Sequence, residues 1–218
     1  MTPAPRIADL PSTVYLFPID RLILLPETTL PMTVTDPRSQ NILDAAESAS
    51  GYVGVIQTRP REERSVSRYF AVGCLGRIRS LEHEDEGHRV TIEGVIRFRV
   101  REELAGGADS LPQATVAYED FESDLLPEEE NVEGWNPEGF RDALLTIARQ
   151  QSGRDKTPLE SMSPRQLVRI LAQTAPLATA EKQALLETRT FRELLELLFQ
   201  LLALNFLTTT PDTSPRTN

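Results

Sequence analysis

The chain has 218 residues, the length of one large domain or two small ones, and 39% of them are hydrophobic, which is enough for a buried core. Its formal charge of -10, from 23 basic and 33 acidic residues, disfavours a protein that wraps nucleic acid or lies on an anionic membrane. The single cysteine excludes an internal disulfide and a cysteine-based zinc cluster, and it fits a reducing compartment.

Both ends of the chain have the composition of disordered segments. Residues 1–12 contain three prolines, and residues 208–218 form a tail rich in Thr, Pro and Ser. The start lacks the apolar run of a signal peptide, and the most apolar stretch, 194–207, is too short and too polar for a membrane span of about 20 residues. We therefore expect a cytoplasmic protein without membrane contact.

The region from 14 to 118 has the short, β-branched apolar runs of strands. The clearest strand is 89–101, in which apolar and polar side chains alternate, and 69–79 alternates in the same way. Residues 84–87 supply a turn, so the two runs predict an antiparallel hairpin. Matching the apolar faces places Cys74 opposite Ile96, Val72 opposite Phe98, and Arg77 opposite Glu93.

Helical patterns flank and follow this β region. Asp36 and Pro37 predict the start of a helix that is inserted between strands, with its apolar face at Ile42, Leu43, Ala46 and Ala49. Further helices are predicted to begin at 136–137 and at 163–164, where Ser163 and Gln166 have capping-box form, and a shorter one spans 180–186. Thr190 and Glu193 cap a last helix that is apolar on more than one face, which favours burial over a dimer contact.

Several short motifs resemble the N-terminal domain of Lon protease, the LON substrate-binding domain. They are Leu16-Phe17-Pro18-Ile19, Leu24-Leu25-Pro26, Leu30-Pro31-Met32, Asp36-Pro37-Arg38, the strand 69–78 and the strand 93–100. The resemblance covers about residues 14–204, with the motifs in family order. The motif residues expected to have structural roles are Phe17, Pro18, Pro26, Pro31, Arg38, Gly73, Glu93, Gly94, Arg97 and Phe98.

The resemblance implies an α+β fold: a PUA-like β-pseudobarrel with one inserted helix, followed by a C-terminal helical bundle, as in stand-alone bacterial members. The expected divisions are a disordered segment 1–12, a β domain 13–122, an acidic connection 123–136, a bundle 137–207 and a disordered tail 208–218. The acidic residues are concentrated between 119 and 142, a segment that contains ten acidic residues and one arginine.

The resemblance also implies a protein- or peptide-binding module rather than an enzyme. The sequence holds no phosphate-binding Gly-x-x-x-x-Gly-Lys-Ser/Thr loop and only two lysines, Lys156 and Lys182. We therefore expect no ATPase or protease activity and no cofactor. The expected partners are unfolded or extended polypeptide and a protease or another protein, with the chain a monomer or homodimer.

Five arginines lie at the alternate positions of the two hairpin strands that are predicted to face outward: Arg77, Arg79, Arg97, Arg99 and Arg101. The first four, with Trp135, are the candidate binding residues. An arginine-rich face on a PUA-like fold also makes RNA binding an alternative function, although nearby acids favour a solvated, internally neutralised face and make nucleic acid an unfavoured partner.

Three other patterns carry possible chemistry. Cys74 could be a nucleophile, but its apolar strand face favours a core position. Residues 82–88 include Glu82, His83 and His88, yet a charged turn fixes no geometry, so we expect no metal site there. Ser152 and Lys156 have the spacing of a serine–lysine pair, but Gly153 between them favours an exposed helix end.

Overall fold

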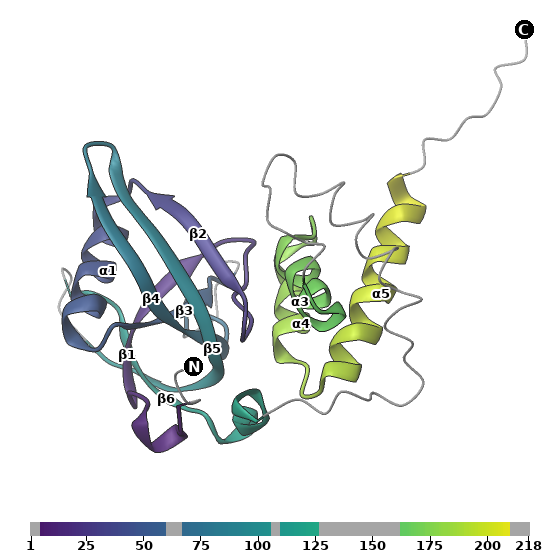
Figure 1. Ribbon diagram of the computed structural model, residues 1–218, viewed down its shortest axis with the longest axis horizontal. Coiled ribbons are helices and arrows are strands. Elements are labelled where there is room, and N and C mark those ends of the chain that lie inside the picture. The colour runs from purple at the N-terminus through teal and green to yellow at the C-terminus, as the bar shows by residue number, and fades with distance from the viewer. Residues whose placement is uncertain (1–4, 60–66, 106–109, 127–161, 210–218) are drawn as a thin grey trace, which may run out of the picture.

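The computed structural model describes residues 5–59, 67–105, 110–126 and 162–209, which form a mixed α+β fold (Figure 1). The strands are β1 (Thr13–Ile19), β2 (Thr29–Val34), β3 (Tyr52–Gln57), β4 (Val72–Glu84), β5 (Gly87–Glu103) and β6 (Gln113–Ala117). The helices are α1 (Pro37–Ala49), α3 (Pro164–Thr174), α4 (Thr179–Glu187) and α5 (Phe191–Thr209), with short 3-10 helices η1 (Ile7–Asp9) and η2 (Glu119–Leu125). The helix predicted at 136–137 lies outside the described residues.

Strand β5 organises the sheet because its 17 residues are long enough to pair with three other strands. One of its edges pairs with β4, whereas the other pairs first with β2 and then with β6. The sheet order is β2-β5-β4-β3-β1-β6, and the additional β5–β6 pairing joins five strands into a closed ring. Strands β1 and β3 are parallel, and α1 lies in the crossover between them.

The predicted hairpin is confirmed, but its register is right only in part. Arg77 is opposite Glu93 as expected. Beyond that pair a β-bulge at Val95 shifts the register by one residue, so Cys74 is opposite Arg97 and Val72 is opposite Arg99. The expected pairs of Cys74 with Ile96 and of Val72 with Phe98 are therefore wrong. Beyond the bulge, residues on both faces of β4 and β5 are buried. The alternation of apolar residues therefore could not show which face each residue occupies there.

The hairpin turn ends at Gly87, a position that requires glycine. Gly87 has a φ of +144°, and a Cβ there would lie 2.5 Å from the carbonyl oxygen of Val34 on β2. Any other residue would therefore be strained and would also push β2 away. The turn is short, with only Asp85 and Glu86 between the strands.

The predicted helix caps are also confirmed. The Asp36 side chain accepts a hydrogen bond from the Ser39 backbone, and Pro37 begins α1. Ile42, Leu43 and Ala46 are buried, whereas the expected apolar position Ala49 is exposed. Ser163 and Gln166 form a capping box at the start of α3. The Thr190 hydroxyl accepts from the Glu193 backbone at the start of α5.

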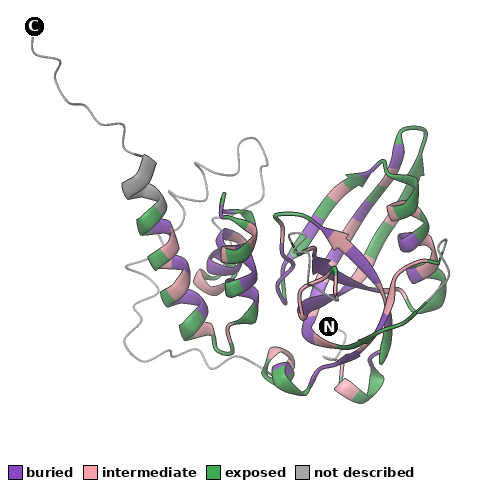
Figure 2. Ribbon diagram, turned by 180° about the vertical axis from the view of Figure 1, so that it is seen from behind, coloured by how far each residue is buried: buried purple, intermediate pink, exposed green. Residues whose placement is uncertain are grey.

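The helices α3, α4 and α5 lie on one side of the sheet, and α1 lies against the other side (Figure 1). Buried and exposed residues alternate along these helices, and buried residues run along the strands of the sheet (Figure 2). Three polar side chains from the helices also reach the sheet region: Gln183 donates to Val72 O, Gln173 to Thr29 O, and Arg169 to Glu27. No helix in the described ranges is long and apolar enough to cross a membrane.

Candidate functional site

The arginines of the hairpin strands are paired with partners supplied by the chain itself. The Arg77 guanidinium donates to the Tyr52 hydroxyl, and Arg79 contacts Glu93. Beyond the bulge the partners are acids of η2: Asp120 for Arg99 at 2.7 Å, Glu119 for Arg101 at 3.8 Å, and Asp124 for Arg97. The hydrogen bond from Arg99 lowers the pKa of Asp120. The described part of the acidic segment thus neutralises this arginine face.

Arg97 does not lie on an exposed face, although the alternation of side chains along its strand predicted that it would. Only 7% of the residue is exposed, because the bulge turns it toward η2 and the turn after α4. It forms two hydrogen bonds with the Asp124 carboxylate, at 2.7 and 2.9 Å, and it donates to the carbonyls of Leu186 and Thr188. The guanidinium also lies 4.6 Å from the ring centroid of Phe121. Arg97 therefore connects β5, η2 and the helices.

Some of the other family-motif residues occupy positions where packing restricts the residue type, and the rest lie nearer the surface. Phe17 and Phe98 are buried in the core, and Pro26 is buried before Glu27, whose φ is +60°. A Cβ on Gly94 would lie 2.0 Å from Leu25 O, and one on Gly73 would lie 2.6 Å from Phe98. Pro18 is half-buried in β1, Pro31 is exposed on β2, Glu93 pairs with Arg79, and Arg38 donates to Ser110 O.

The residues considered for nucleophilic chemistry give no catalytic arrangement within the described ranges. Cys74 is completely buried, and burial raises the pKa of its thiol, so the reactive thiolate is disfavoured. Ser152 and Lys156 lie outside the described residues, as does Trp135.

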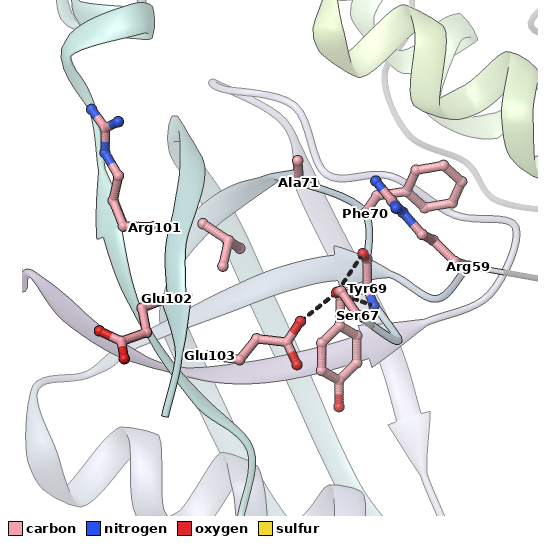
Figure 3. Close-up of a pocket in the computed structure, with 9 residues that line it drawn as sticks. Arg59, Ser67, Tyr69, Phe70, Ala71, Arg101, Glu102 and Glu103 are labelled. Atoms are coloured by element: carbon pink, nitrogen blue, oxygen red, sulfur yellow. Dashed lines mark hydrogen bonds between the residues drawn. The ribbon is translucent and has the colours of Figure 1, made fainter. Parts of the chain in front are cut away.

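An open groove of about 390 Å³ lies where β3 ends, β4 begins and β5 leaves the hairpin (Figure 3). Its lining residues are Arg59, Ser67, Tyr69, Phe70, Ala71, Val100, Arg101, Glu102 and Glu103. Backbone hydrogen bonds hold its walls together, from Phe70 N to Gln57 O at 3.1 Å and from Val100 N to Ala71 O at 2.8 Å. The groove is thus built on paired backbone on both sides.

The lining of the groove combines apolar side chains with charges of both signs. The Arg59 guanidinium lies 5.4 Å from the ring centroid of Phe70, and Ser67 donates to the Glu103 carboxylate (Figure 3). Burial raises the pKa of Tyr69, which keeps its phenol neutral. The described lining contains no cysteine, histidine or lysine. Such a surface can bind apolar and charged side chains, but it lacks the histidine that most often acts as a general base.

Sequence reasoning found Arg101 as part of an arginine face but missed this groove. The alternation predicts that Tyr69, Phe70 and Ala71 belong to a strand, whereas β4 begins only at Val72. The aromatic pair followed by Ala, directly before a Gly-containing strand, was the available signal. The predicted hairpin already placed 69–71 beside 99–101, but no sequence pattern indicated that these residues would line a groove with Arg59 and Ser67.

The model of the ATP-dependent protease La (LON) substrate-binding domain family matches residues 13–203. Two curated relatives are "Lon protease 2" of Myxococcus xanthus, 25% identical over 89% of this chain, and "Lon protease 2" of Syntrophobacter fumaroxidans, 25% identical over 82%. The chain spans 24% and 22% of the lengths of these relatives.

Two solved structures share the fold. The N-terminal domain of the Mycobacterium avium complex Lon protease aligns with a TM-score of 0.61 and 18% identity, over 88% of this chain and 98% of that one. The Lon N-terminal domain protein from Xanthomonas campestris aligns with a TM-score of 0.56 and 21% identity, over 88% and 97% of the two chains.

Proposed function

The chain belongs to the family of LON substrate-binding domains, and we propose that it is a non-catalytic module that binds unfolded or extended polypeptide. The observation that carries the proposal is the groove between the start of β4 and the end of β5. Family membership supplies the class of function, protein substrate binding, and the groove supplies a surface for it.

The groove suits an extended chain because its lining offers both apolar and charged side chains. Phe70, Ala71 and Val100 offer apolar contact, whereas Arg101 and Glu102 offer opposite charges beside it. In an extended peptide, successive side chains point to opposite sides, so one can contact the apolar residues of the lining while its neighbours meet the charged ones. Affinity should therefore come chiefly from Phe70, whereas the charged residues should adjust which polypeptides are preferred.

The proposal includes the finer architecture implied by the family. The closed ring of strands would be a PUA-like pseudobarrel within 13–122, residues 123–136 an acidic connection, and 137–207 a helical bundle. A protease or another protein partner would receive the bound polypeptide. The free, buried Cys74 is compatible with the reducing conditions of the cytoplasm.

RNA binding is disfavoured as a second function because the arginines that suggested it have acidic or hydroxyl partners. Arg79, Arg97 and Arg99 each form an ion pair within the chain. A protein that gains affinity from phosphate contacts needs such cations available to neutralise phosphates. RNA is therefore used in the test only as a second labelled probe.

The test is a titration of the full chain into a fluorescently labelled, permanently unfolded polypeptide, followed by anisotropy. Phe70→Ala removes the phenyl ring from the lining and should weaken binding about fivefold or more. Arg101→Glu reverses one rim charge and should change the preference for acidic over basic polypeptides. Arg89→Glu is the matched control, because Arg89 is an exposed arginine near the hairpin turn, paired with Glu84 and outside the groove.

Absence of binding at high micromolar concentration would refute the function. Binding that Phe70→Ala leaves intact in a folded variant would refute the groove as its site. Binding of a labelled RNA instead, with a steep loss of affinity as salt rises, would support the RNA alternative.

A further inference from the structure

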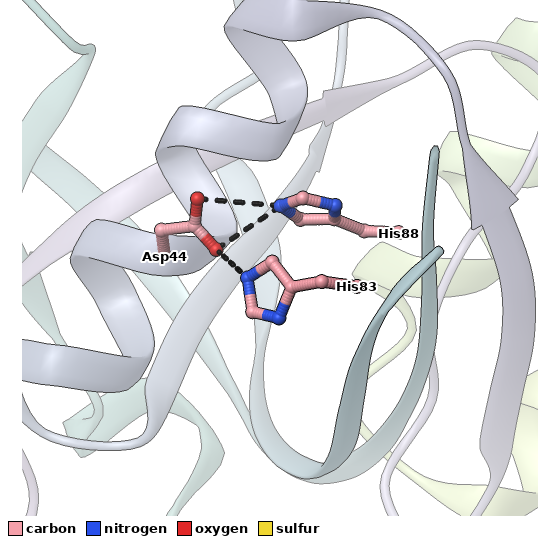
Figure 4. Close-up of side chains that lie close together, drawn as sticks. All are labelled: Asp44, His83 and His88. Carbon is pink, nitrogen blue, oxygen red and sulfur yellow. Dashed lines mark hydrogen bonds and ion pairs between the residues drawn. The ribbon is translucent and has the colours of Figure 1, made fainter. Parts of the chain in front are cut away.

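A cluster of metal-ligating side chains lies at the opposite end of β5 from the groove. His83 on β4 and His88 on β5 are directly opposed in the hairpin register. Asp44 reaches both from α1, so three side chains from three elements converge (Figure 4). The sequence-based expectation of a solvated turn without a metal considered only 82–88 and did not include Asp44.

The ligand atoms already have nearly the spacing that a metal ion requires. The Nε2 atom of His83 lies 3.0 Å from Asp44 Oδ1, and that of His88 lies 3.2 Å from the same oxygen. All three ligand atoms lie within 4.8 Å of one another. In a tetrahedral zinc site with ligand bonds of about 2.0–2.2 Å, neighbouring ligand atoms are about 3.4 Å apart. Small side-chain movements would therefore suffice.

The backbone positions of the three residues are fixed before any ion binds. His88 is paired on one side with His83 and on the other with Val34 of β2. Asp44 follows the buried residues Ile42 and Leu43 in α1, and Gln40 ties that helix to the carbonyl of Val34. A preformed arrangement of this kind loses little conformational entropy when a ligand binds.

The cluster is electrostatically suited to a cation and is open on one side. The Asp44 carboxylate supplies a negative charge, and one of its oxygens lies 3.0 Å from His83 Nε2 while the other lies 3.3 Å from His88 Nε2. The His88 side chain is 12% exposed, whereas His83 is 60% exposed. His88 Nδ1 is buried without a hydrogen-bond partner in the described part of the chain, so Nε2, which faces Asp44, is the nitrogen of this ring that can bind an ion.

We propose that Asp44, His83 and His88 bind a divalent transition-metal ion of the Zn²⁺ type, which fastens the hairpin tip to α1. Two imidazole nitrogens and one carboxylate oxygen are ligands that Zn²⁺ accepts in proteins. Water would complete the four ligands on the exposed side. The site is distinct from the groove, and the proposal does not depend on polypeptide binding.

The experiment is calorimetric titration of ZnCl₂ into the full, untagged chain after removal of metal with a chelator. We expect one ion per chain, and at least a tenfold loss of affinity in His83→Ala and Asp44→Asn, since even residues that merely orient metal ligands contribute about 10–100-fold. Glu82→Gln and Glu86→Gln are matched controls from the same hairpin and should bind as the wild type does. Saturating Zn²⁺ should also raise the melting temperature of the wild type by about 5 °C, but not that of His83→Ala.

His83 and Asp44 are the decisive positions, because their side chains are 60% and 43% exposed and their replacement leaves the core untouched. Circular dichroism in chelator checks that both variants keep the wild-type fold. No heat of binding and no shift in melting temperature in the wild type would overturn the proposal and leave a metal-free hydrogen-bonded cluster. Equal binding by the wild type and both variants would overturn it as well.

Discussion

Lys182 is a buried cation whose hydrogen-bond partners, within the described ranges, are all backbone carbonyl groups. It is 1% exposed, and its Nζ atom donates to the carbonyls of Ala172 and Gln173 near the end of α3. Cations are favourable at a helix C-terminus, yet burial still lowers the pKa of Lys182 to about 8. The protonated lysine therefore lowers stability relative to the neutral one.

The lowered pKa predicts that the contribution of Lys182 to stability increases as the pH rises above 8. Below pH 8 both folded and unfolded chains carry the proton, so Lys182 contributes no pH dependence. Between about 8 and 10.5 the unfolded chain binds more protons, so the free energy of unfolding increases with pH. From pH 7 to 9 the wild type should gain about 1 kcal/mol relative to Lys182→Met.

Urea unfolding of both proteins at pH 7, 8 and 9 measures this difference. The comparison with Lys182→Met removes the opposite contribution of Cys74, whose pKa is raised by burial and which therefore lowers stability at high pH. Parallel stability profiles for the two proteins would show that Lys182 keeps its ordinary pKa.

Among the secondary-structure elements, α3 owes part of its stability to the capping box in its first turn. The Ser163 hydroxyl accepts from the Gln166 backbone at 3.2 Å, and the Gln166 side chain accepts from the Ser163 backbone at 2.9 Å. Ser163→Ala should lower the free energy of unfolding by about 1 kcal/mol, because a helical N–H loses its acceptor. Ser163→Asp keeps an acceptor and should stay close to the wild type. Thermal unfolding of the three proteins tests the prediction, and equal stability of Ala and Asp variants would contradict it.

Features that depend on neighbours in sequence were predictable from the sequence. The cap at Asp36, the capping box at Ser163 and the hairpin around 84–87 each require residues only a few positions apart. The bulge at Val95 was less accessible, although Gly94 in a strand interior was a signal for it. Once the bulge is present, residues beyond it change faces, which is why Arg97 was misplaced.

Contacts between distant elements account for what sequence reasoning missed. Asp44 meets His83 and His88 across separations of 39 and 44 residues, and no local pattern marks it. The groove likewise combines Arg59 and Ser67 with the far end of β5, which is more than 30 positions away in the sequence. Family resemblance predicted the fold class, but such contacts depend on the full three-dimensional arrangement.

Across the whole molecule, polar side chains join the helices to the sheet. Gln57 donates to the Gln183 side chain, and Thr28 donates to that of Gln173. The partners are far apart in sequence, at separations of 126 and 145 positions. Buried polar groups need such partners, so the two parts of the molecule satisfy each other and should unfold together.

The Arg97–Asp124 pair should be the strongest of these connections, because its side chains are only 8% and 7% exposed. Asp124→Asn removes the negative charge and leaves a buried guanidinium that is not neutralised, which should cost about 3–5 kcal/mol. Asp120→Asn is the matched control, since its pair with Arg99 is largely exposed and should matter little.

Native-state hydrogen exchange distinguishes a lost connection from a general loss of stability. In Asp124→Asn, amides of α3 and α4 should lose more protection than those of β4, because the ring of strands keeps its own hydrogen bonds while the helices lose their attachment. Equal loss of protection in helices and strands would mean that the molecule remains one cooperative unit without this pair. Unchanged stability in Asp124→Asn would instead show that the carbonyls of Leu186 and Thr188 suffice for Arg97.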